Sequence, residues 1–597
     1  MRRKIINKNT DKIASLERDT FVGIVEYARR GAYVVTDHKI LKNDIFVPDH
    51  LLHHARNGQK VLVKLTTWKK YSRYPDGEVI DILGNIGEND TEMHAILAEY
   101  GLPYSYPEQL ENEADKIKAN IEDEVYKRKD MRDVTTFTID PADAKDFDDA
   151  LSIRTLDCSD SKQSDNKTIY EVGVHIADVT YYVQPQSELD KEAYERGTSV
   201  YLVDRTIPLL PEHLSNDICS LRPNEDKLCF SVIFQLDEQA HVIKYDIKRT
   251  VICSNRRFTY EEAQERIANG SGDFSAELKT LNSLAQHLRK RRFEHGSINF
   301  EREEVRFSLD EDGKPVSVYF TEPKDANFLI EEFMLLANKT VAELIGKNNN
   351  SKNSAARTFV YRVHDVPDPD KLQDLNGFIK KFGYNLKGAE KKQSTAKNIN
   401  KLLSDVKGKP EQNLIETLTV RSMAKAIYST DNIGHYGLAF PYYTHFTSPI
   451  RRYPDMMVHR LLSKYLKGGA NAGKDEYEDR CKHCSDKERL AAEAERASIK
   501  YKQVEFMQDQ IGKVFEGIIS GVTEWGVYVE ITENKCEGLI PMRELNSDDY
   551  FVFNEKEYCI EGMQTGKRFT LGDKVIVKVL SADLQKRQLD FGLLNAN

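Results

Sequence analysis

The chain has 597 residues, of which 40% are hydrophobic, and a formal net charge of −10. This length predicts two to four domains with well-buried cores. The acidic total excludes a protein that binds nucleic acid through an overall positive charge, although local basic clusters can still attract polyanions. No run approaches the 18 apolar residues of a membrane span, and eight cysteines in so long a chain favour a reducing compartment. We therefore expect a cytoplasmic protein without a membrane anchor.

The first part of the chain predicts a small β-domain followed by a connector. Residues 1–17 are basic and lack the apolar segment of a secretory signal, which is typical of a polar tail. Short strands and glycine turns over residues 18–84 predict a barrel of the OB type. Its mixture of tyrosines and arginines near Tyr33 is typical of single-strand binders. Residues 85–130 are charged and predict a helical connector.

The rest of the chain predicts a large mixed domain and a second barrel. Residues 131–465 alternate strand-like and helix-like segments, and strong helix formers fill residues 466–510. Residues 511–595 are again rich in strand formers and predict a second OB-type barrel. The overall class is a multidomain α+β protein, with a central α/β domain flanked by two small barrels. Aromatic residues on strands more often belong to a core, but three in the second barrel are candidates for stacking on bases, namely Phe515, Trp525 and Tyr528.

Five aspartates lie in the ten residues from Asp140 to Asp149. The segments on either side of them are strand-like, which places the carboxylates on a turn at a strand end. Like charges repel at close range, so a compact protein keeps such a run when a cation neutralises it. Mg²⁺ takes oxygen ligands and keeps waters and substrate phosphates in its other positions. The run therefore predicts a Mg²⁺ site for phosphoryl chemistry.

Two ordinary explanations of the aspartate run compete with a metal site. A solvated acidic loop is the usual one, but apolar strand residues bracket this run and Phe147 lies within it. An EF-hand loop needs glycine at its sixth position and glutamate at its twelfth. Counted from Asp140, those positions hold Lys145 and Leu151, so an EF-hand is excluded.

A second chemical segment spans residues 444–455. Pro449 is predicted to begin a helix, which would put Arg451 and Arg452 in its first turn. Two arginines beside helix-terminal amides suit an anion such as a phosphate. A structural salt bridge to acidic residues elsewhere explains the same pattern equally well.

Further segments are weak when taken alone. Tyr201, followed by a charged pair, is suited to stacking a base, and Glu332 lies on a helix whose apolar face lets it approach a pocket. His175 in a buried strand is more often a satisfied core histidine than a ligand.

Together the segments resemble the ribonuclease II / ribonuclease R (RNB) family over nearly the whole chain. The first barrel resembles the family's cold-shock domain, and the last resembles the RNA-binding domain named for ribosomal protein S-one. Several stretches are closer to the ribonuclease R branch, among them residues 214–223. The matching segments lie in the family's order, and they are residues 138–150, 174–179, 214–223, 331–338, 445–455 and 494–498.

The resemblance implies a processive 3′→5′ exoribonuclease. Such an enzyme hydrolyses single-stranded RNA to nucleoside 5′-monophosphates by a two-metal mechanism with Mg²⁺, for which Mn²⁺ is an alternative. It would act on the 3′ end of RNA as a monomer in RNA turnover. Duplex unwinding and end-product length are left open.

The resemblance also assigns residues by their motifs. Asp148 matches the carboxylate needed for catalysis more than for RNA binding, whereas Asp143 has no assigned place and is expected to be structural. Tyr201 matches the clamp on the 3′-terminal base, and Arg451 matches the contact to the scissile phosphate. The remaining predicted metal ligands and catalytic carboxylates are Asp140, Asp146 and Asp149, and the remaining predicted RNA-binding residues are Glu332, Glu495, Arg452, Phe515, Trp525 and Tyr528.

Two departures and two alternatives remain. Leu209 stands where the family usually has methionine, which is a mild packing change. One cold-shock domain is found where two are usual, and it resembles the second. A catalytically decayed RNA-binding protein is one alternative, although decay would be expected to remove the aspartates or Arg451 first and all of them are present. A nuclease that acts mainly on DNA is the other, because discrimination of the 2′-hydroxyl depends on geometry.

Overall fold

A computed structural model describes residues 18–36, 41–68, 72–156, 168–298, 304–349, 356–386, 392–409, 411–545, 549–554, 557 and 559–594. The basic tail predicted for residues 1–17 lies outside this part of the chain. Within it, no helix has the length and apolar character needed to cross a membrane.

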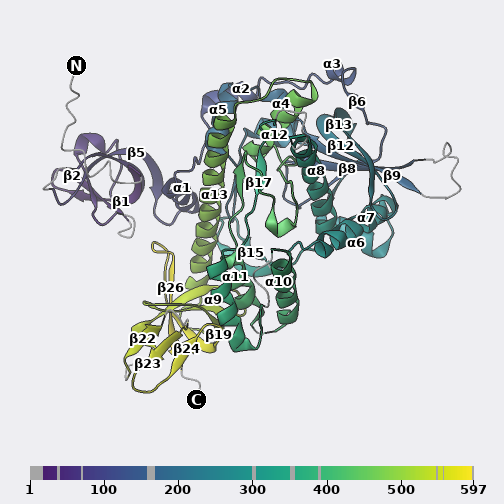
Figure 1. Cartoon of the computed structure of the whole chain (residues 1–597). Helices are drawn as coiled ribbons and strands as arrows, with labels where there is room; N and C mark the ends of the chain where they lie inside the picture. The colour runs from purple at the N-terminus through teal and green to yellow at the C-terminus, as the bar shows by residue number, and fades with distance from the viewer. Residues whose placement is uncertain are drawn as a thin grey trace, which may run out of the picture.

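The N-terminal strands close into the predicted barrel (Figure 1). Alternate residues of the strands point inward and are buried, as with Val25, Val34 and Val63, because side chains on a strand alternate between two faces. The strands follow the order β1-β2-β3-β5-β4 around the barrel, and their bounds are β1 (Thr20–Ala28), β2 (Gly31–Thr36), β3 (Ile45–Val47), β4 (Gln59–Thr67) and β5 (Asp76–Asn85).

The connector is helical, as predicted. A buried ion pair between Lys60 of β4 and Glu92 fixes its first helix to the barrel. The helices are α1 (Asn89–Glu99), α2 (Glu108–Ala114) and α3 (Glu122–Val125).

A twisted sheet forms the middle of the molecule in the order β14-β7-β8-β9-β12-β13-β6. The pairs β14–β7 and β13–β6 are parallel, and the other neighbouring pairs are antiparallel. The strands are β6 (Lys129–Asp130), β7 (Thr136–Asp140), β8 (Asp149–Leu156), β9 (Ile169–Ala177), β12 (Asp226–Leu236), β13 (Val242–Cys253) and β14 (Arg256–Thr259). This mixed domain confirms the predicted class, and its sheet is of the α+β kind because few of its pairs are parallel.

Helices and short hairpins make up the rest of the central region. They are α4 (Val179–Tyr182), α5 (Glu188–Arg196), β10 (Val200–Tyr201), β11 (Thr206–Ile207), α6 (Tyr260–Asn269), α7 (Ser275–Glu294), β15 (Glu304–Leu309), β16 (Pro315–Thr321), α8 (Asp325–Asn349), β17 (Tyr361–Val363), α9 (Pro369–Ile379), α10 (Lys392–Val406), α11 (Gln412–Ser422), β18 (Ile427–Ser429) and α12 (Tyr453–Leu466). One apolar core joins the sheet with α8 and α12 through Phe333, Met456 and Leu461, whereas α9, α10 and α11 form a separate apolar cluster.

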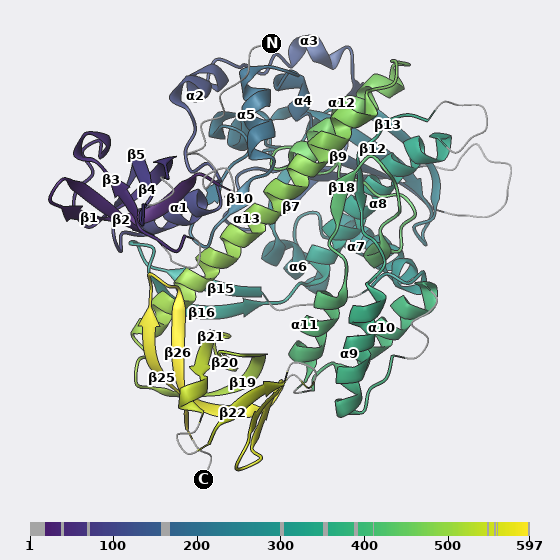
Figure 2. The ribbon, with the colours of Figure 1, turned by 60° about the vertical axis from the view of Figure 1, so that its left-hand side comes forward.

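One long helix, α13 (Lys474–Gln508), runs from the central domain down to the C-terminal barrel (Figure 2). The predicted barrel forms there, with the strand order β19-β20-β21-β26-β25, and it carries a separate small sheet. Gly526 has a φ of +146° where β20 begins, and a Cβ there would collide with the carbonyl oxygen of Ile540. The strands are β19 (Val514–Thr523), β20 (Gly526–Ile531), β21 (Glu537–Pro541), β22 (Phe551–Asn554), β23 (Cys559–Gly562), β24 (Arg568–Thr570), β25 (Lys574–Asp583) and β26 (Gln588–Leu594).

Candidate active site

The aspartate run forms the loop between β7 and β8, as its flanking strands predicted. Backbone contacts fix this loop in place: the amide of Phe147 donates to Ser220 Oγ at 3.1 Å, and the amide of Ala177 donates to the carbonyl of Asp148 at 2.9 Å. The amide of Leu221 also donates to the carbonyl of Phe147, whose ring is buried. The loop is therefore an ordered part of the domain and not a solvated excursion.

Asp148 is the most buried carboxylate of the loop, with 5% of the residue exposed. Its Oδ1 accepts from the amide of Ile450 at 2.8 Å, and its Oδ2 lies 3.6 Å from Arg451 Nε. That Oδ2, and Oδ2 of Asp140, are buried and have no hydrogen-bond partner among the described residues. Buried carboxylate oxygens without partners are costly, which indicates that something outside the chain satisfies them.

The four predicted carboxylates share one electrostatic environment. Burial raises the pKa of Asp148 well above its ordinary value, and Arg451 opposes this rise. Burial also raises the pKa of Asp140, to which repulsion from Asp149 adds, and burial raises the pKa of Asp149 and of Asp146. A cation among the carboxylates would offset the cost of burying their charges and would lower each pKa.

The donor set fits a hard divalent cation in part. In the portion of the chain that the structure describes, no three carboxylate, histidine or cysteine side chains converge closely enough to hold one ion by themselves. Mg²⁺ is commonly held by one or two carboxylates, with waters and substrate phosphates in the other positions. The unpartnered oxygens of Asp140 and Asp148 meet that need, so the residues fit ions that are completed by the substrate.

The two adjacent arginines have different surroundings. The side chain of Arg451 is 41% exposed and lies beside Asp148. Arg452 instead donates from Nε and Nη2 to the two oxygens of Asp455, at 2.9 and 2.8 Å, and its side chain is 17% exposed. Two donors of Arg452 are thus engaged within the protein, by an acidic residue of the same segment and not by one elsewhere in the chain, and its contact with RNA stays a prediction.

The helix that follows these arginines begins later than predicted. Pro449 lies in a turn, α12 starts at Tyr453, and Pro454 is the proline of its first turn. Arg452 has an extended backbone (φ −135°, ψ 120°) because it pairs with Thr198, which a helical residue could not do. The prediction that both arginines lie in the first turn is therefore wrong.

Tyr201 reaches the carboxylates through that same pairing. The amide of Ser199 donates to the carbonyl of Arg451 at 2.9 Å, so the β10–β11 hairpin lies against the arginine segment. Partial burial raises the pKa of Tyr201 to about 12, Arg451 opposes this rise, and the charges of Asp146 and Asp148 add to it. The structure thus brings together the predicted clamp, the predicted phosphate contact and the aspartates.

The two predicted glutamates, Glu332 and Glu495, have no contact with the aspartate loop among those described above. Glu332 is 3% exposed and accepts from Arg292 Nε at 3.0 Å, so its carboxylate is satisfied inside the protein, whereas the neighbouring Glu331 is exposed. Glu495 is exposed on α13. Their contacts with a terminal nucleotide remain predictions.

The aromatic candidates of the second barrel differ in exposure. Trp525 is 68% exposed in the turn between β19 and β20, which makes it available for stacking. Tyr528 is half-buried opposite Gly521, and Phe515 packs partly against the barrel core.

One residue near the carboxylates was missed in the sequence. Tyr260 follows β14, whose residue Thr259 pairs with Asp140. Burial raises the pKa of Tyr260, with further contributions from the charges of Asp149 and Asp140. A strand-like segment ending in tyrosine gave no signal of this, because the parallel β14–β7 pairing joins segments more than 110 residues apart.

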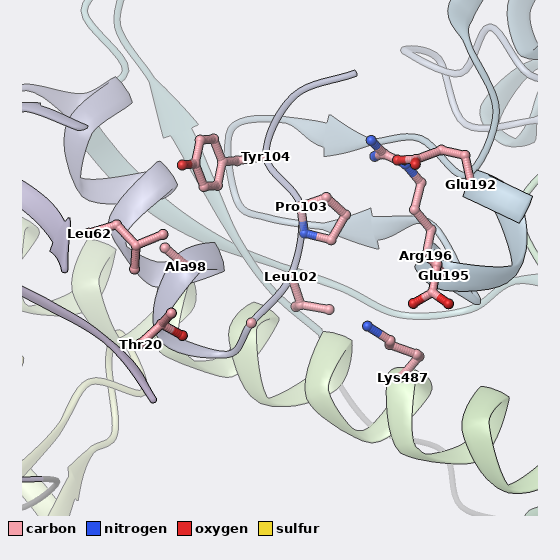
Figure 3. A pocket seen from close by; sticks show the side chains of 11 residues that line it. Thr20, Leu62, Ala98, Leu102, Pro103, Tyr104, Glu192, Glu195, Arg196 and Lys487 are labelled. Atoms are coloured by element: carbon pink, nitrogen blue, oxygen red, sulfur yellow. The ribbon is translucent and has the colours of Figure 1, made fainter. Parts of the chain in front are cut away.

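A pocket of about 370 Å³ lies elsewhere, between the N-terminal barrel, α5 and α13 (Figure 3). Leu102 and Tyr104 of the connector and Lys487 of α13 line it. None of the predicted site residues lines this pocket, so it is separate from the candidate active site.

Comparisons with known proteins identify all three regions. Residues 128–468 match the RNB domain, residues 33–107 match the cold shock domain, and residues 508–593 match the S1 RNA binding domain. Ribonuclease R of Aquifex aeolicus is 38% identical over 596 residues, which cover 98% of this chain and 81% of the relative. Ribonuclease R of Escherichia coli is 34% identical over 585 residues, covering 94% and 69%.

Solved structures show the same architecture. RNase R of Mycoplasma genitalium, in complex with ribose-methylated single-stranded RNA, superimposes with a TM-score of 0.87 at 27% identity, covering 97% of this chain and 90% of that one. Yeast Ssd1, a pseudonuclease, has a TM-score of 0.69 at 20% identity, covering 92% and 68%, and shares the fold alone.

An RNB domain between two OB-type RNA-binding domains defines the class of RNA-degrading proteins to which the fold corresponds. Within that class, the chain belongs to the ribonuclease R family. The family predicted from the sequence is thereby confirmed.

Proposed function

We propose that the chain is a processive 3′→5′ exoribonuclease that hydrolyses single-stranded RNA to nucleoside 5′-monophosphates. The observation that supports this most directly is the convergence of Asp148, Arg451 and Tyr201 at one place in a ribonuclease R fold. RNase R of Mycoplasma genitalium has been solved with single-stranded RNA and with double-stranded RNA, which supports RNA as the ligand. A cytoplasmic monomer stays our prediction for location and assembly.

Each residue has a separate task in this proposal. Asp140, Asp146, Asp148 and Asp149 would hold Mg²⁺ or Mn²⁺, which supplies Lewis-acid activation of water and stabilises the leaving oxygen. Arg451 offsets the negative charge that develops on the phosphate. Tyr201 stacks on the last base and so sets which phosphodiester bond lies at the carboxylates. No covalent intermediate is needed, because water is the nucleophile.

A catalytically decayed RNA-binding protein is the competing proposal, and the shared fold of a pseudonuclease shows that architecture alone does not decide it. The retained aspartates and Arg451 disfavour decay.

The test uses one RNA labelled at either end, with Mg²⁺ or with EDTA. We expect the 3′ label to appear at once as a mononucleotide. The 5′ label should pass from full-length RNA to a short end product with few intermediates, because a processive enzyme does not release its substrate between cleavages. Cleavage that begins at the 5′ end, or that persists in EDTA, would contradict the proposal. A duplex with a 3′ overhang then shows whether the enzyme passes through paired RNA or stalls at its edge.

A further inference from the structure

A buried lysine joins distant segments beneath the Tyr201 hairpin. The side chain of Lys502, on α13, is 0% exposed. Its Nζ donates to Asn89 Oδ1 at 2.8 Å, to the carbonyl of Gly313 at 2.6 Å and to Glu505 Oε2 at 2.7 Å. A buried ammonium is costly unless its hydrogens find acceptors, and here all three do. Lys502 is therefore a fixed junction between α13, the start of α1 and the turn between β15 and β16.

Asn89 extends this junction to the hairpin that carries Tyr201. Asn89 Nδ2 donates to Asp204 Oδ2 at 2.7 Å, and Asp204 lies in the turn between β10 and β11. Asp204 also accepts from Arg205 Nε at 3.0 Å, and Arg205 Nη2 donates to Asp90 Oδ1 at 2.6 Å. The turn is thus tied to the first residues of α1 by two separate contacts.

The two faces of the hairpin have different surroundings. Val200 and Leu202 are 3% and 8% exposed and pack in one apolar cluster with residues of α1 and α13. Tyr201 lies between them in sequence and is 38% exposed. Because side chains alternate along a strand, the packing of Val200 and Leu202 directs Tyr201 to the opposite face. Whatever fixes the turn therefore fixes the position of Tyr201.

The same two helices also touch the RNA-binding barrels. Glu92 of α1 pairs with Lys60 of the N-terminal barrel. On α13, Lys500 Nζ donates to the carbonyl of Glu537, and Gln503 Nε2 donates to the carbonyl of Lys535 at 3.1 Å, both in the C-terminal barrel region. A long RNA held by the barrels has other anchors besides Tyr201, whereas a short RNA has few.

We infer that Lys502 and Asn89 are positioning residues that hold the Tyr201 hairpin and thereby set how short an RNA the enzyme can still grip. The inference rests on the proposed 3′-end site. It assigns them no contact with RNA: they act through Tyr201.

The experiment compares Lys502→Met and Asn89→Asp with the wild type. Methionine keeps the length of the side chain without its donors, and aspartate keeps the acceptor for Lys502 while placing a like charge against Asp204. The matched control is Lys482→Met, because Lys482 is an exposed lysine on the same helix. The two substrates are a tetranucleotide and a 30-nucleotide RNA. An OB fold binds about 4–16 nucleotides, so the tetranucleotide is too short to occupy the active site and a barrel at the same time.

We expect both variants to raise KM for the tetranucleotide about tenfold, to change KM for the long RNA less than about threefold and to leave longer end products. Adding Lys502→Met to Tyr201→Ala should raise KM for the tetranucleotide little beyond Tyr201→Ala alone, because both substitutions act on the same contact of Tyr201 with RNA. Equal changes for both substrates, or end products like those of the wild type, would overturn the inference. If one variant fails to fold, shown by its thermal midpoint, the other decides. A wild type that does not degrade RNA from its 3′ end would instead refute the proposed function.

Discussion

Two buried aspartates at neighbouring strand ends differ in whether the protein itself supplies a counter-charge for the carboxylate. Asp178 directly follows β9 and is 1% exposed, and Asp148 directly precedes β8 and is 5% exposed. Burial alone would raise the pKa of Asp178, but Arg249 and Arg128 hold it below its ordinary value. Asp148 has one distant arginine contact, an unpartnered Oδ2 and a raised pKa. The protein itself neutralises Asp178, whereas under the proposed function a bound cation would neutralise Asp148.

The sharpest test of this contrast replaces Asp148. We expect Asp148→Asn to lower kcat at least about 1,000-fold, which corresponds to about 4 kcal/mol of transition-state stabilisation. The amide loses the charge that a metal ion needs, which lowers kcat. It keeps the hydrogen bond from Ile450 and therefore the shape of the site, so Kd for RNA should change less than about threefold. Single-turnover cleavage and fluorescence anisotropy measure the two quantities. Asp143→Asn, exposed on the same loop, is the control. An equal loss of cleavage and affinity would refute this role for Asp148.

The matching change at Asp178 should affect stability instead. Asp178→Asn removes the counter-charge of Arg249 and one of the two counter-charges of Arg128, which is 2.7 Å from Asp178 Oδ2 and also pairs with Glu124. Breaking a buried ion pair from one side costs about 3 kcal/mol. We expect the free energy of unfolding in urea to fall by about that amount, while kcat per folded molecule stays within about twofold. Asp246→Asn, which breaks an exposed pair with Lys248 on β13, should cost less than 1 kcal/mol. A large loss of kcat in folded Asp178→Asn would show that Asp178 also serves catalysis, which would contradict the proposed difference between Asp178 and Asp148.

The contrast also shows what could be read from the sequence. Density of charge identified the aspartate loop, and strand formers on both sides placed it correctly, because both signals are local. The partners of the loop could not be found locally: Ile450 lies about 300 residues from Asp148, and Tyr260 reaches Asp140 only through the parallel β14–β7 pairing. Arg451 and Arg452 look equivalent in sequence, but Arg451 lies beside the distant Asp148, whereas Arg452 bridges to Thr198 and pairs with Asp455. Long-range pairing, not composition, decided these outcomes.

The two arginines offer a smaller version of the same contrast. We expect Arg451→Lys to lower kcat about 100-fold, or about 2.7 kcal/mol, because lysine cannot reproduce a planar contact to phosphate. Its effect on stability should be small, since the Arg451 side chain is 41% exposed. Arg452→Lys loses a two-point contact with buried Asp455 and should cost about 2 kcal/mol of stability with a modest effect on kcat. Urea unfolding and steady-state cleavage of both variants measure this. Similar losses of kcat in the two variants would show that Arg452 also contacts the substrate.

The response of stability to pH tests the same contrast in the metal-free protein. The pKa values of Asp140 and Asp148 are raised in the folded state, so between the unfolded value of about 3.9 and the raised values the folded state binds more protons. The free energy of unfolding of the metal-free protein should therefore fall as pH rises through this window, by about 1.4 kcal/mol for each unit of pKa difference. Asp178 has the opposite sign: its lowered pKa adds stability that is present above about pH 3.9 and is lost as pH falls further.

Mg²⁺ separates the two contributions, because it should bind the ionised loop and leave Asp178 unaffected. We expect Mg²⁺ to raise the thermal midpoint more at pH 8 than at pH 5, and Asp140→Asn to reduce both the loss of stability at high pH and the gain from Mg²⁺. Differential scanning calorimetry across pH, with Mg²⁺ or EDTA, gives these values. The control is Asp143→Asn, which should follow the wild type. If Mg²⁺ stabilised the protein equally at both pH values, the raised pKa values would not reflect a cation site, and the distinction between Asp148 and Asp178 would be one of burial alone.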